Sequence, residues 1–503
     1  MTFMIRGVSI VMTVSKEYLM SHSETSTARL AQLQAQPLAE RFALQQVAAR
    51  GDPNPQRAVR ERRLAALDQM LRDNAVAIGE AVSRDFGHRS AAETRLLELF
   101  PSYEAIRHAR RHLRRWMRPQ RRSVSLWFQP GRAEVRYQPL GAVGIIVPWN
   151  YPIFLAIAPL AAALAAGNRA LVKMSEMSPH TAALFATLVA KTFSADELSV
   201  VEGDASVAQA FSQLPFDHLL FTGSTVIGHH VMRAAADHLT PVTLELGGKS
   251  PAIIGPGLAA SKDFAHAVER ILIGKCMNAG QTCIAPDYVL LPAGDEQAFI
   301  DCARAVVASA YPHLATNGDY STIIDPRHYA RLSAYVDEAR ASGAKIIELA
   351  PGAAADAAKR CLPPLALLGV GDTQPVMQEE IFGPLLPIRP YRHLDEAIAF
   401  VNGRPRPLAL YYFDSDRERI ERVLNETVSG GVTINDTILH IAQDDLPFGG
   451  VGASGMGCYH GFEGFETFSS KKGVFRQSRL SGIGLFKPPY GRLFKLLTRI
   501  LMR

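Results

Sequence analysis

The chain of 503 residues is poor in cysteine, and its five cysteines are an odd number spread widely along the sequence. No Cys-x-x-Cys pair occurs, and no cysteines and histidines cluster at the spacing of zinc ligands. The pattern argues against a disulfide framework. It predicts a reducing compartment, a cytoplasmic location and no bound metal.

The chain also lacks internal repeats, low-complexity tracts and the pattern of a secretory leader. Near the N-terminus only residues 7–14 form an apolar run, and no small-residue cleavage pattern follows it. We therefore expect residues 1–26 to be a disordered extension.

What is present is the composition of an ordinary globular protein, with 48% hydrophobic and 20% charged residues. The length exceeds what one hydrophobic core usually organises, so two or more lobes are expected.

An arginine-rich segment contributes much of the net charge of +6. It could bind nucleic acid. However, Ile106, Leu113, Trp116 and Met117 recur within it at roughly helical spacing, which favours the solvated or dimer-edge face of an amphipathic helix. The arginines of the segment are Arg107, Arg110, Arg111, Arg114, Arg115, Arg118, Arg121 and Arg122.

The hydrophobic pattern changes along the chain. From residue 27 to about Trp116 it is helical, and after Pro130 short apolar strands alternate with helices. This alternation predicts an α/β fold with a parallel, doubly wound sheet. The predicted strands are 135–137, 143–147, 170–173, 198–202, 218–221 and 242–246, and the predicted helices are 154–166, 178–191, 205–213 and 226–238.

Unusual residues follow four of these strands. Because doubly wound sheets bind ligands beyond the carboxyl ends of their strands, these residues should meet at one crevice. The four segments are Pro148-Trp149-Asn150, Lys173-Met174-Ser175-Glu176, Thr222-Gly223-Ser224 and Glu245-Leu246-Gly247-Gly248-Lys249.

Cys283 is the candidate nucleophile. It follows Gly280 in a predicted loop, where its sulfur could reach a bound carbonyl carbon. The other four cysteines are interpreted as small buried hydrophobic residues.

Several segments resemble the aldehyde dehydrogenase superfamily: PWN, FTGS, ELGGKSP, GQTCIAPDY, EEIFGP and LPFGGVGASGMGCYHG. The last two, with the basic helix and the short N-terminal lead-in, are similar to its class 3 branch and to the bacterial coniferyl aldehyde dehydrogenases. The resemblance implies oxidation of an aldehyde to a carboxylic acid with NAD or NADP. It implies an aromatic, coniferyl-type substrate, with medium- or long-chain aliphatic aldehydes as the alternative.

The resemblance also assigns catalytic roles. Cys283 would attack the aldehyde to give a thiohemiacetal, and Asn150 and the Cys283 amide would stabilise its oxyanion. Glu245 would be the general base that activates water to hydrolyse the resulting thioester.

The turn from Thr222 to Gly228 could present amides to a pyrophosphate. By resemblance it is the dinucleotide turn, with Gly223, Ser224 and Gly228 as contacts. The remaining cofactor residues implied by the resemblance are Trp149, Lys173, Glu176, Glu380 and Phe382. Glu176 disfavours a 2′-phosphate, but both cofactors stay open.

One motif lacks its required context. Residues 450–455 match Gly-x-Gly-x-x-Gly but precede no clear helix, so we assign them no phosphate.

The tail from Arg492 to Arg503 has an apolar face opposite a basic one. It could touch a membrane, although packing over the substrate entrance or a neighbouring subunit needs the same face and is preferred.

The resemblance implies a homodimer formed through a short hairpin and the region after Gly431. The expected division is a dinucleotide-binding domain (27–123 and 139–248), a catalytic domain (249–432), an oligomerisation segment (124–138 and 433–475) and a tail (476–503). Two other functions remain open. A thiol acyl hydrolase would need no dinucleotide, and a nucleic-acid binder would show salt-dependent affinity.

Overall fold

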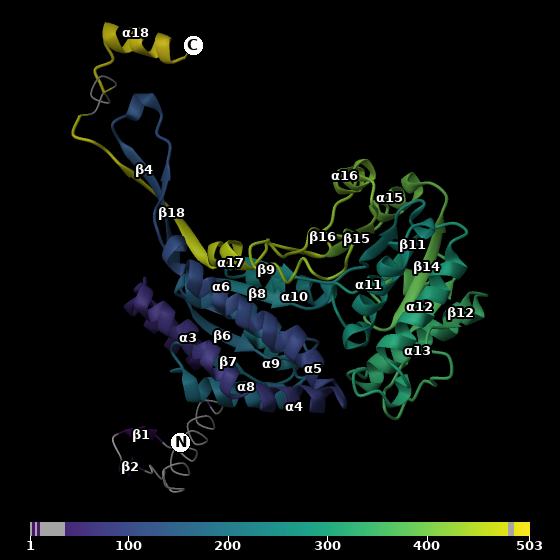
Figure 1. Cartoon of the computed structure of the whole chain (residues 1–503). Coiled ribbons are helices and arrows are strands. Elements are labelled where there is room, and N and C mark those ends of the chain that lie inside the picture. The colour runs from purple at the N-terminus through teal and green to yellow at the C-terminus, as the bar shows by residue number, and fades with distance from the viewer. Residues whose placement is uncertain (1–2, 6–7, 11–35, 481–486, 503) are drawn as a thin grey trace.

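The computed structural model describes residues 3–5, 8–10, 36–480 and 487–502. Two α/β lobes lie side by side, and a narrow antiparallel arm projects from the first lobe (Figure 1). No helix within these residues is long and apolar enough to cross a membrane.

The first lobe is built on a six-stranded sheet in the order β17-β9-β8-β5-β6-β7. Five of its strands are parallel, which confirms the predicted doubly wound sheet, and β17 pairs with β9 in the antiparallel direction. From the central β5 the chain moves out to β6 and β7, then returns to β8 on the other side. The strands are β5 (Ala142–Ile146), β6 (Arg169–Lys173), β7 (Leu198–Val201), β8 (His218–Thr222), β9 (Val242–Glu245) and β17 (Gly455–Met456).

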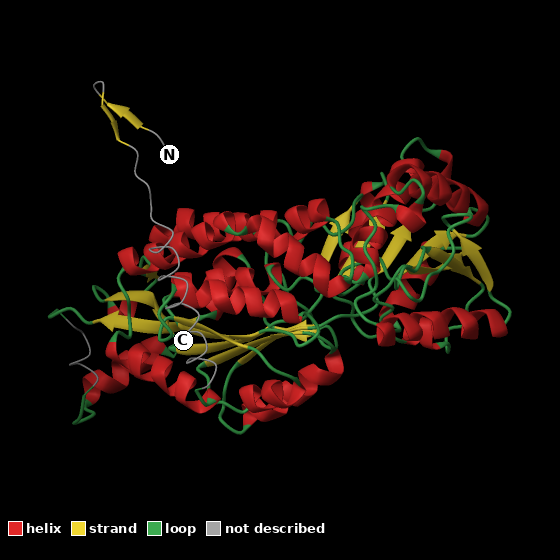
Figure 2. Ribbon diagram, turned by 90° about the horizontal axis from the view of Figure 1, so that it is seen from below, coloured by secondary structure: helices red, strands yellow, loops and turns green. Residues whose placement is uncertain are grey.

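Helices cover both faces of this sheet (Figure 2). Alternate residues of β5 point to opposite sides, so Ile146 packs with α2, α9 and α10 while Ile145 packs toward α7 and α8. The helices of this lobe are α2 (Leu38–Gly51), α3 (Arg57–Asp73), α4 (Ala75–Phe86), α5 (Ala91–Thr94), α6 (Phe100–Trp116), α7 (Phe154–Ala166), α8 (Pro179–Thr192), α9 (Ala205–Ser212), α10 (Thr225–Ala236) and α17 (Gly461–Thr467).

Helix α7 is buried along its whole length between the sheet and the layer formed by α3 and α6. Its all-apolar sequence matches that position. The helix stops at Gly167, which has a left-handed backbone (φ 98°), as expected for a C-terminal glycine.

The second lobe contains a seven-stranded sheet in the order β12-β13-β14-β11-β10-β15-β16, in which only β12 is antiparallel. Its strands are β10 (Pro251–Ile254), β11 (Tyr288–Pro292), β12 (Lys345–Glu348), β13 (Leu365–Leu368), β14 (Leu385–Tyr391), β15 (Ala409–Phe413) and β16 (Gly431–Ile434). Its helices are α11 (Phe264–Cys276), α12 (Glu296–Ala310), α13 (Pro326–Ala341), α14 (Pro375–Gln378), α15 (Leu394–Asn402) and α16 (Arg417–Glu426).

The arm consists of β3 (Gln120–Arg122), β4 (Arg132–Pro139) and β18 (Ser469–Arg476). The expected oligomerisation segment 433–475 is therefore divided. Its last residues enter the arm, whereas β17 extends the first lobe's sheet, where Gly455 pairs with Glu245. Residues 450–455 thus lead into a strand rather than a helix.

Helix α6 confirms the amphipathic interpretation of the arginine-rich segment. Ile106, Leu113 and Trp116 are buried, and the arginines are exposed. The helix ends at Trp116, so Arg121 and Arg122 belong to β3 instead.

Two terminal segments complete the description. In place of an unstructured extension, β1 (Phe3–Ile5) and β2 (Val8–Ile10) form a two-stranded antiparallel hairpin, since these residues have high strand propensity. The rest of the predicted extension, residues 1–2, 6–7 and 11–26, lies outside the described residues. At the other end, α18 (Arg492–Leu501) lies beyond the arm (Figure 1).

Candidate active site

The loop that carries Cys283 begins with an unusual turn. After α11 ends at Cys276, Asn278, Ala279 and Gly280 all have positive φ, at 51°, 50° and 77°. A Cβ on Gly280 would collide with the carbonyl of Gly383, so glycine is required there. The half-buried Cys283 follows this turn.

Asn150, just after β5 and next to the first lobe's sheet, lies against this loop. Its Nδ2 donates a hydrogen bond to the carbonyl of Gln281 at 3.2 Å. Its own carbonyl accepts hydrogen bonds from Asn278 Nδ2 at 3.1 Å and Arg89 Nη1 at 3.0 Å. The side chain is only 3% exposed. The first lobe's strand end and the nucleophile loop are thus joined directly.

A buried ion pair supports the Asn150 turn from behind. Glu98 lies in a π-helical segment, Arg95–Leu99, and accepts a hydrogen bond from Arg89 at 2.9 Å. Its other oxygen accepts the amides of Ile153 and Phe154 at 2.7 and 3.3 Å. Glu98 therefore caps the start of α7 while Arg89 holds the Asn150 carbonyl.

Gln281 ties the same loop to the second lobe. It is fully buried, and its Nε2 donates to the carbonyls of Asn278 at 2.9 Å and Thr322 at 3.0 Å. Its Oε1 accepts the amide of Ile324 at 2.9 Å. Both polar atoms are satisfied, so the loop has little freedom to move.

Glu245, the last residue of β9, is bonded differently. It is 2% exposed, and neither carboxylate oxygen has a hydrogen-bond partner among the described residues. Burial raises the pKa of this carboxyl well above its ordinary value. The raised pKa makes the ionised form of this carboxyl a stronger proton acceptor than an ordinary carboxylate.

Burial raises the pKa of the Cys283 thiol, and the nearby carboxylates of Glu380 and Glu245 raise it further. The backbone amides of Cys283 and Ile284 lower it, because they donate toward the sulfur. The thiol is therefore protonated in this environment, and its reaction needs a proton acceptor.

The turn between β8 and α10 has a backbone that a ligand could approach closely. Ser224 caps α10 by accepting the amide of Ile227 at 3.4 Å, and the amide of Gly223 donates to the carbonyl of Glu245 at 3.0 Å. A side chain at Gly228 would press on Leu246 of the neighbouring strand end. The first turn of α10 leaves backbone amides free to face a ligand.

A cavity of about 580 Å³ lies between this helix start and the second lobe. Its lining includes Thr225, Gly247, Gly248, Lys249 and Glu380. Glu380 is half-buried, its Oε1 has no partner among the described residues, and burial raises its pKa to about 8. Of the predicted cofactor residues, Glu380 is the one that lines this cavity.

Lys173 and Glu176 lie at the end of β6. The Lys173 ammonium donates to the carbonyls of Met174 at 2.7 Å and Gly203 at 2.8 Å, and it lies 4.0 Å from the Glu176 carboxylate. It is 1% exposed, whereas the Glu176 side chain is half-exposed. Lys173 thus braces two strand ends, and Glu176 remains accessible.

Trp149 lies in an aromatic group with Phe86, His328 and Phe382. Its ring centre is 5.3 Å from Phe382 and 5.2 Å from His328, both edge to face. Phe382 has a positive φ of 50°, a strained backbone for an aromatic residue. The structure therefore places Trp149 against Phe382, which lies two residues after Glu380 in the sequence.

Comparison with known proteins identifies the family. The model of the aldehyde dehydrogenase family matches residues 22–474. The chain belongs to the aldehyde dehydrogenase family. It is 53% identical to a protein of Pseudomonas aeruginosa described as a probable coniferyl aldehyde dehydrogenase, covering 92% of this chain and 96% of that protein. It is 48% identical to a coniferyl aldehyde dehydrogenase of Pseudomonas sp. HR199, covering 88% and 92%.

Solved structures agree. The substrate-bound state of Staphylococcus aureus AldH superposes with a TM-score of 0.87 at 36% identity, covering 93% of this chain and all of that chain. A Mycobacterium tuberculosis aldehyde dehydrogenase complexed with NAD+ superposes with a TM-score of 0.76 at 28% identity. The match covers 86% of this chain and 88% of that chain. The protein is an aldehyde dehydrogenase that uses NAD or NADP, in the predicted fold.

The aldehyde dehydrogenase contains site residues that we did not predict. Arg89, Glu98 and Asn278 have no motif that sets them apart in the sequence, whereas Gln281 lies within the segment GQTCIAPDY. For Glu98 a signal exists, because a carboxylate within the apolar run Leu96–Leu99 is either exposed or specifically bonded. For Gln281 the signal is its position in that segment, two residues before Cys283.

Proposed function

We propose that Cys283, Asn150 and Glu245 perform the chemistry of this aldehyde dehydrogenase. The observation that carries the proposal is the unpartnered, buried carboxylate of Glu245 near a protonated Cys283 thiol. Glu245 accepts the thiol proton, directly or through water, and the sulfur bonds to the aldehyde carbon. The carbonyl oxygen of the aldehyde then becomes an oxyanion.

Two donors are placed for that oxyanion. Asn150 Nδ2 carries two hydrogens, and only one is used on the Gln281 carbonyl, so the second is free. The amide of Cys283, which faces its own sulfur, is the other. When bound, NAD or NADP supplies a nicotinamide ring that accepts the hydride. The carbon–oxygen double bond re-forms, leaving a thioester on Cys283.

Hydrolysis completes the cycle. Glu245 first releases the thiol proton to solvent and then removes a proton from water. The hydroxide adds to the thioester, the sulfur–carbon bond breaks to release the carboxylic acid, and Glu245 returns its proton to the Cys283 thiolate. Glu245 thus takes part in both halves of the reaction.

The residues around the cavity suit a dinucleotide. The free amides at the start of α10, with Gly223, Ser224 and Gly228, would hold the pyrophosphate. The unpartnered Glu380 oxygen is an acceptor for a ribose hydroxyl, with Phe382 and Trp149 beside it. Lys173 and Glu176 would hold the adenosine ribose, and Lys173 does so from a position already fixed by two carbonyls.

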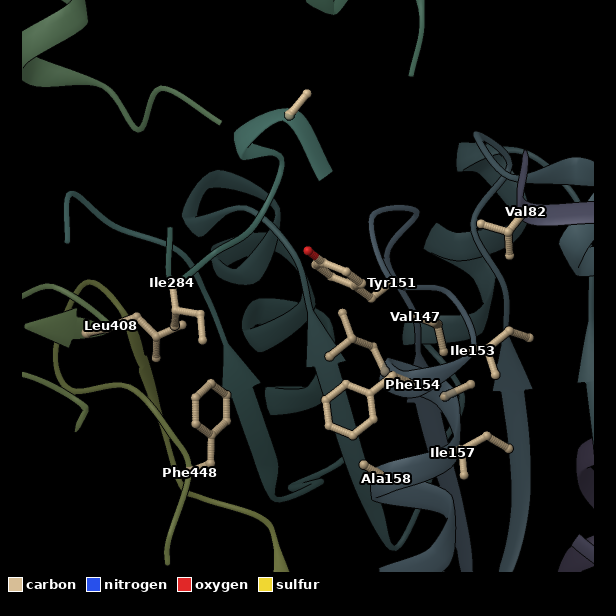
Figure 3. Packing of buried hydrophobic residues seen from close by; sticks show 14 of the residues in the cluster. Val82, Val147, Tyr151, Ile153, Phe154, Ile157, Ala158, Ile284, Leu408 and Phe448 are labelled. Atoms are coloured by element: carbon tan, nitrogen blue, oxygen red, sulfur yellow. The ribbon is translucent and has the colours of Figure 1, made fainter. Parts of the chain in front are cut away.

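The proposed substrate is an aromatic, coniferyl-type aldehyde. Support comes from the names of the two Pseudomonas relatives and from aromatic side chains packed in the core next to the nucleophile loop, where the Tyr151 hydroxyl lies 2.6 Å from Thr282 Oγ1. Figure 3 shows Tyr151 and Phe154 on one side and Ile284, Leu408 and Phe448 on the other. The ring centre of His460 lies 5.4 Å from that of Phe448 and 6.1 Å from that of Phe154. Neither nitrogen of His460 has a hydrogen-bond partner among the described residues.

A long-chain or isoprenoid aldehyde is the second candidate. A 4,4'-diaponeurosporen-aldehyde dehydrogenase of S. aureus is 39% identical over 87% of this chain. The test compares kcat/KM for coniferaldehyde, cinnamaldehyde and decanal, each with NAD and NADP. We expect coniferaldehyde to exceed decanal by about tenfold or more. The reverse order would select the second candidate, and cofactor-free ester hydrolysis as the main activity would indicate an acyl hydrolase.

We further propose that the arm mediates homodimerisation. Leu126, Trp127 and Phe128 at its tip are each about half exposed or more, and Phe475 of β18 is 49% exposed beside them. A second copy of the chain would cover this apolar tip. The cytoplasmic location stays a prediction.

A further inference from the structure

Helix α18 has two chemically distinct faces. Leu493, Leu496, Leu497 and Ile500 share one side at three- and four-residue spacing, while the cations Arg492, Lys495 and Arg499 share the opposite side. With about ten residues the helix is roughly 15 Å long. It is far too short to span a bilayer but long enough to lie along a surface.

The apolar face of α18 is not packed into the described part of the chain. No residue of the helix is buried, and Leu493, Leu496 and Ile500 are 54%, 57% and 55% exposed. The preferred expectation is packing over the substrate entrance or a neighbouring subunit. Within the chain's described residues, no element buries this face. Leaving three large aliphatic side chains in water is unfavourable, so this face needs an occupant.

Charge indicates which occupant fits. From Thr467 to Arg503 the sequence contains nine lysines and arginines and no aspartate or glutamate. Lys471 and Arg476 of the arm pair with Glu466 of α17 and Glu134 of β4, but none of the three cations of α18 forms an ion pair with any described residue. A segment this basic repels a second copy of itself and attracts an anionic surface.

We propose that α18 docks this enzyme on an anionic lipid surface. The helix lies in the plane of the headgroups, with Leu493, Leu496 and Ile500 inserted among the acyl chains and Arg492, Lys495 and Arg499 against lipid phosphates. The attachment is peripheral and reversible, because neither the apolar face nor three cations is sufficient for permanent anchoring. It is independent of the proposed aldehyde and of the catalytic residues.

The test uses the full-length protein and vesicles of phosphatidylcholine, with or without about a third of phosphatidylglycerol. We expect co-sedimentation with the anionic vesicles only, and weaker binding as salt is raised. Substituting Arg492→Gln, Lys495→Gln and Arg499→Gln together should weaken binding by about fivefold for each cation removed. Leu493→Ser, Leu496→Ser and Ile500→Ser together should abolish binding even at low salt.

A matched control removes the same charge elsewhere. Arg111→Gln, Arg114→Gln and Arg115→Gln change three exposed cations of α6, and this variant should bind vesicles like the wild type. All variants should keep their dehydrogenase activity in the absence of vesicles, which verifies folding. Absence of wild-type binding, or equal loss in the α6 control, would overturn the proposal. A change of oligomeric state in the serine variant, with no vesicle binding by the wild type, would assign the face to a second subunit instead.

Discussion

The nucleophile loop differs in its hydrogen bonding from the two carboxylates beside it, the buried Glu245 and the half-buried Glu380. Asn150, Asn278 and Gln281 hold one another and both lobes through hydrogen bonds of 2.9 to 3.2 Å. Within the described part of the chain, Glu245 has no partner at either oxygen, and Glu380 has none at Oε1. The bonded groups keep the geometry, whereas the unpaired groups can change protonation or accept a ligand.

The comparison predicts the largest effect at Cys283. Cys283→Ala removes the nucleophile that attacks the aldehyde, so we expect a loss of kcat of about four decades or more. The affinity for NAD or NADP should stay within about twofold, because the dinucleotide contacts come from other strand ends. Steady-state rates and fluorescence titration of the reduced cofactor measure the two quantities. Full activity in this variant would refute the mechanism.

Glu245→Gln keeps the size of the side chain but cannot accept a proton. We expect a burst of reduced cofactor followed by a steady rate lower by about two to four decades, with acyl-enzyme accumulating on Cys283. Rapid-mixing absorbance measures the burst and the steady rate, and intact mass detects the acyl-enzyme. If Glu245 also takes the thiol proton, the burst itself should slow.

Turnover of the Glu245 variant at the wild-type rate would exclude the carboxylate as the base. A missing burst and a missing adduct, despite normal cofactor binding, would mean that Glu245 acts before hydride transfer as well as after it.

Variants of Asn150 and Asn278 distinguish hydrogen-bond donation to the oxyanion from positioning of the nucleophile loop. Asn150→Ala removes an oxyanion donor and should lower kcat by about two to three decades. Asn278→Gly keeps the positive φ of the turn and loses the side-chain bonds to the carbonyls of Asn150 and Gln281, so we expect a decrease of about tenfold. Measured kcat values for both variants, at saturating aldehyde, make the test. Equal losses would show that Asn150 acts only by holding the loop.

The smallest effect concerns stability and pH. Burial raises the pKa of Glu380 from 4.5 to about 8, so the folded protein favours the protonated form. The protonated carboxyl therefore contributes to the free energy of unfolding. This contribution is complete below about pH 4.5 and is lost as the pH rises through about 8. The glutamine of Glu380→Gln cannot ionise. The melting temperature of this variant should therefore rise relative to that of the wild type as the pH increases across this range.

Melting curves of the cofactor-free proteins between pH 5 and 9 test the Glu380 prediction. The exposed Glu418→Gln on α16 is the matched control and should show no such trend. A constant difference for Glu380→Gln across the range would mean that the carboxyl is ionised throughout.

Local patterns were sufficient to predict much of the first lobe. The strands β5 to β9 and the helices between them follow from short apolar runs, and α7 ends at Gly167 because only glycine adopts its backbone there readily. Cys283 was singled out in a loop after Gly280, Asn150 and Glu245 stand at strand ends, and the family resemblance assigned the catalytic role of each. The amphipathic character of α6 and α18 was equally visible.

The tertiary structure alone decided which of these segments meet. The pairing of β17 with β9, the Arg89–Glu98 ion pair behind Asn150 and the bonds of Gln281 to Asn278 and Thr322 join residues that local pattern does not relate. The absence of partners is also a tertiary property, since the unpaired oxygens of Glu245 and the open apolar face of α18 appear only when all described neighbours are placed. Periodicity and turn chemistry act over a few residues, whereas burial and pairing depend on the whole packed chain.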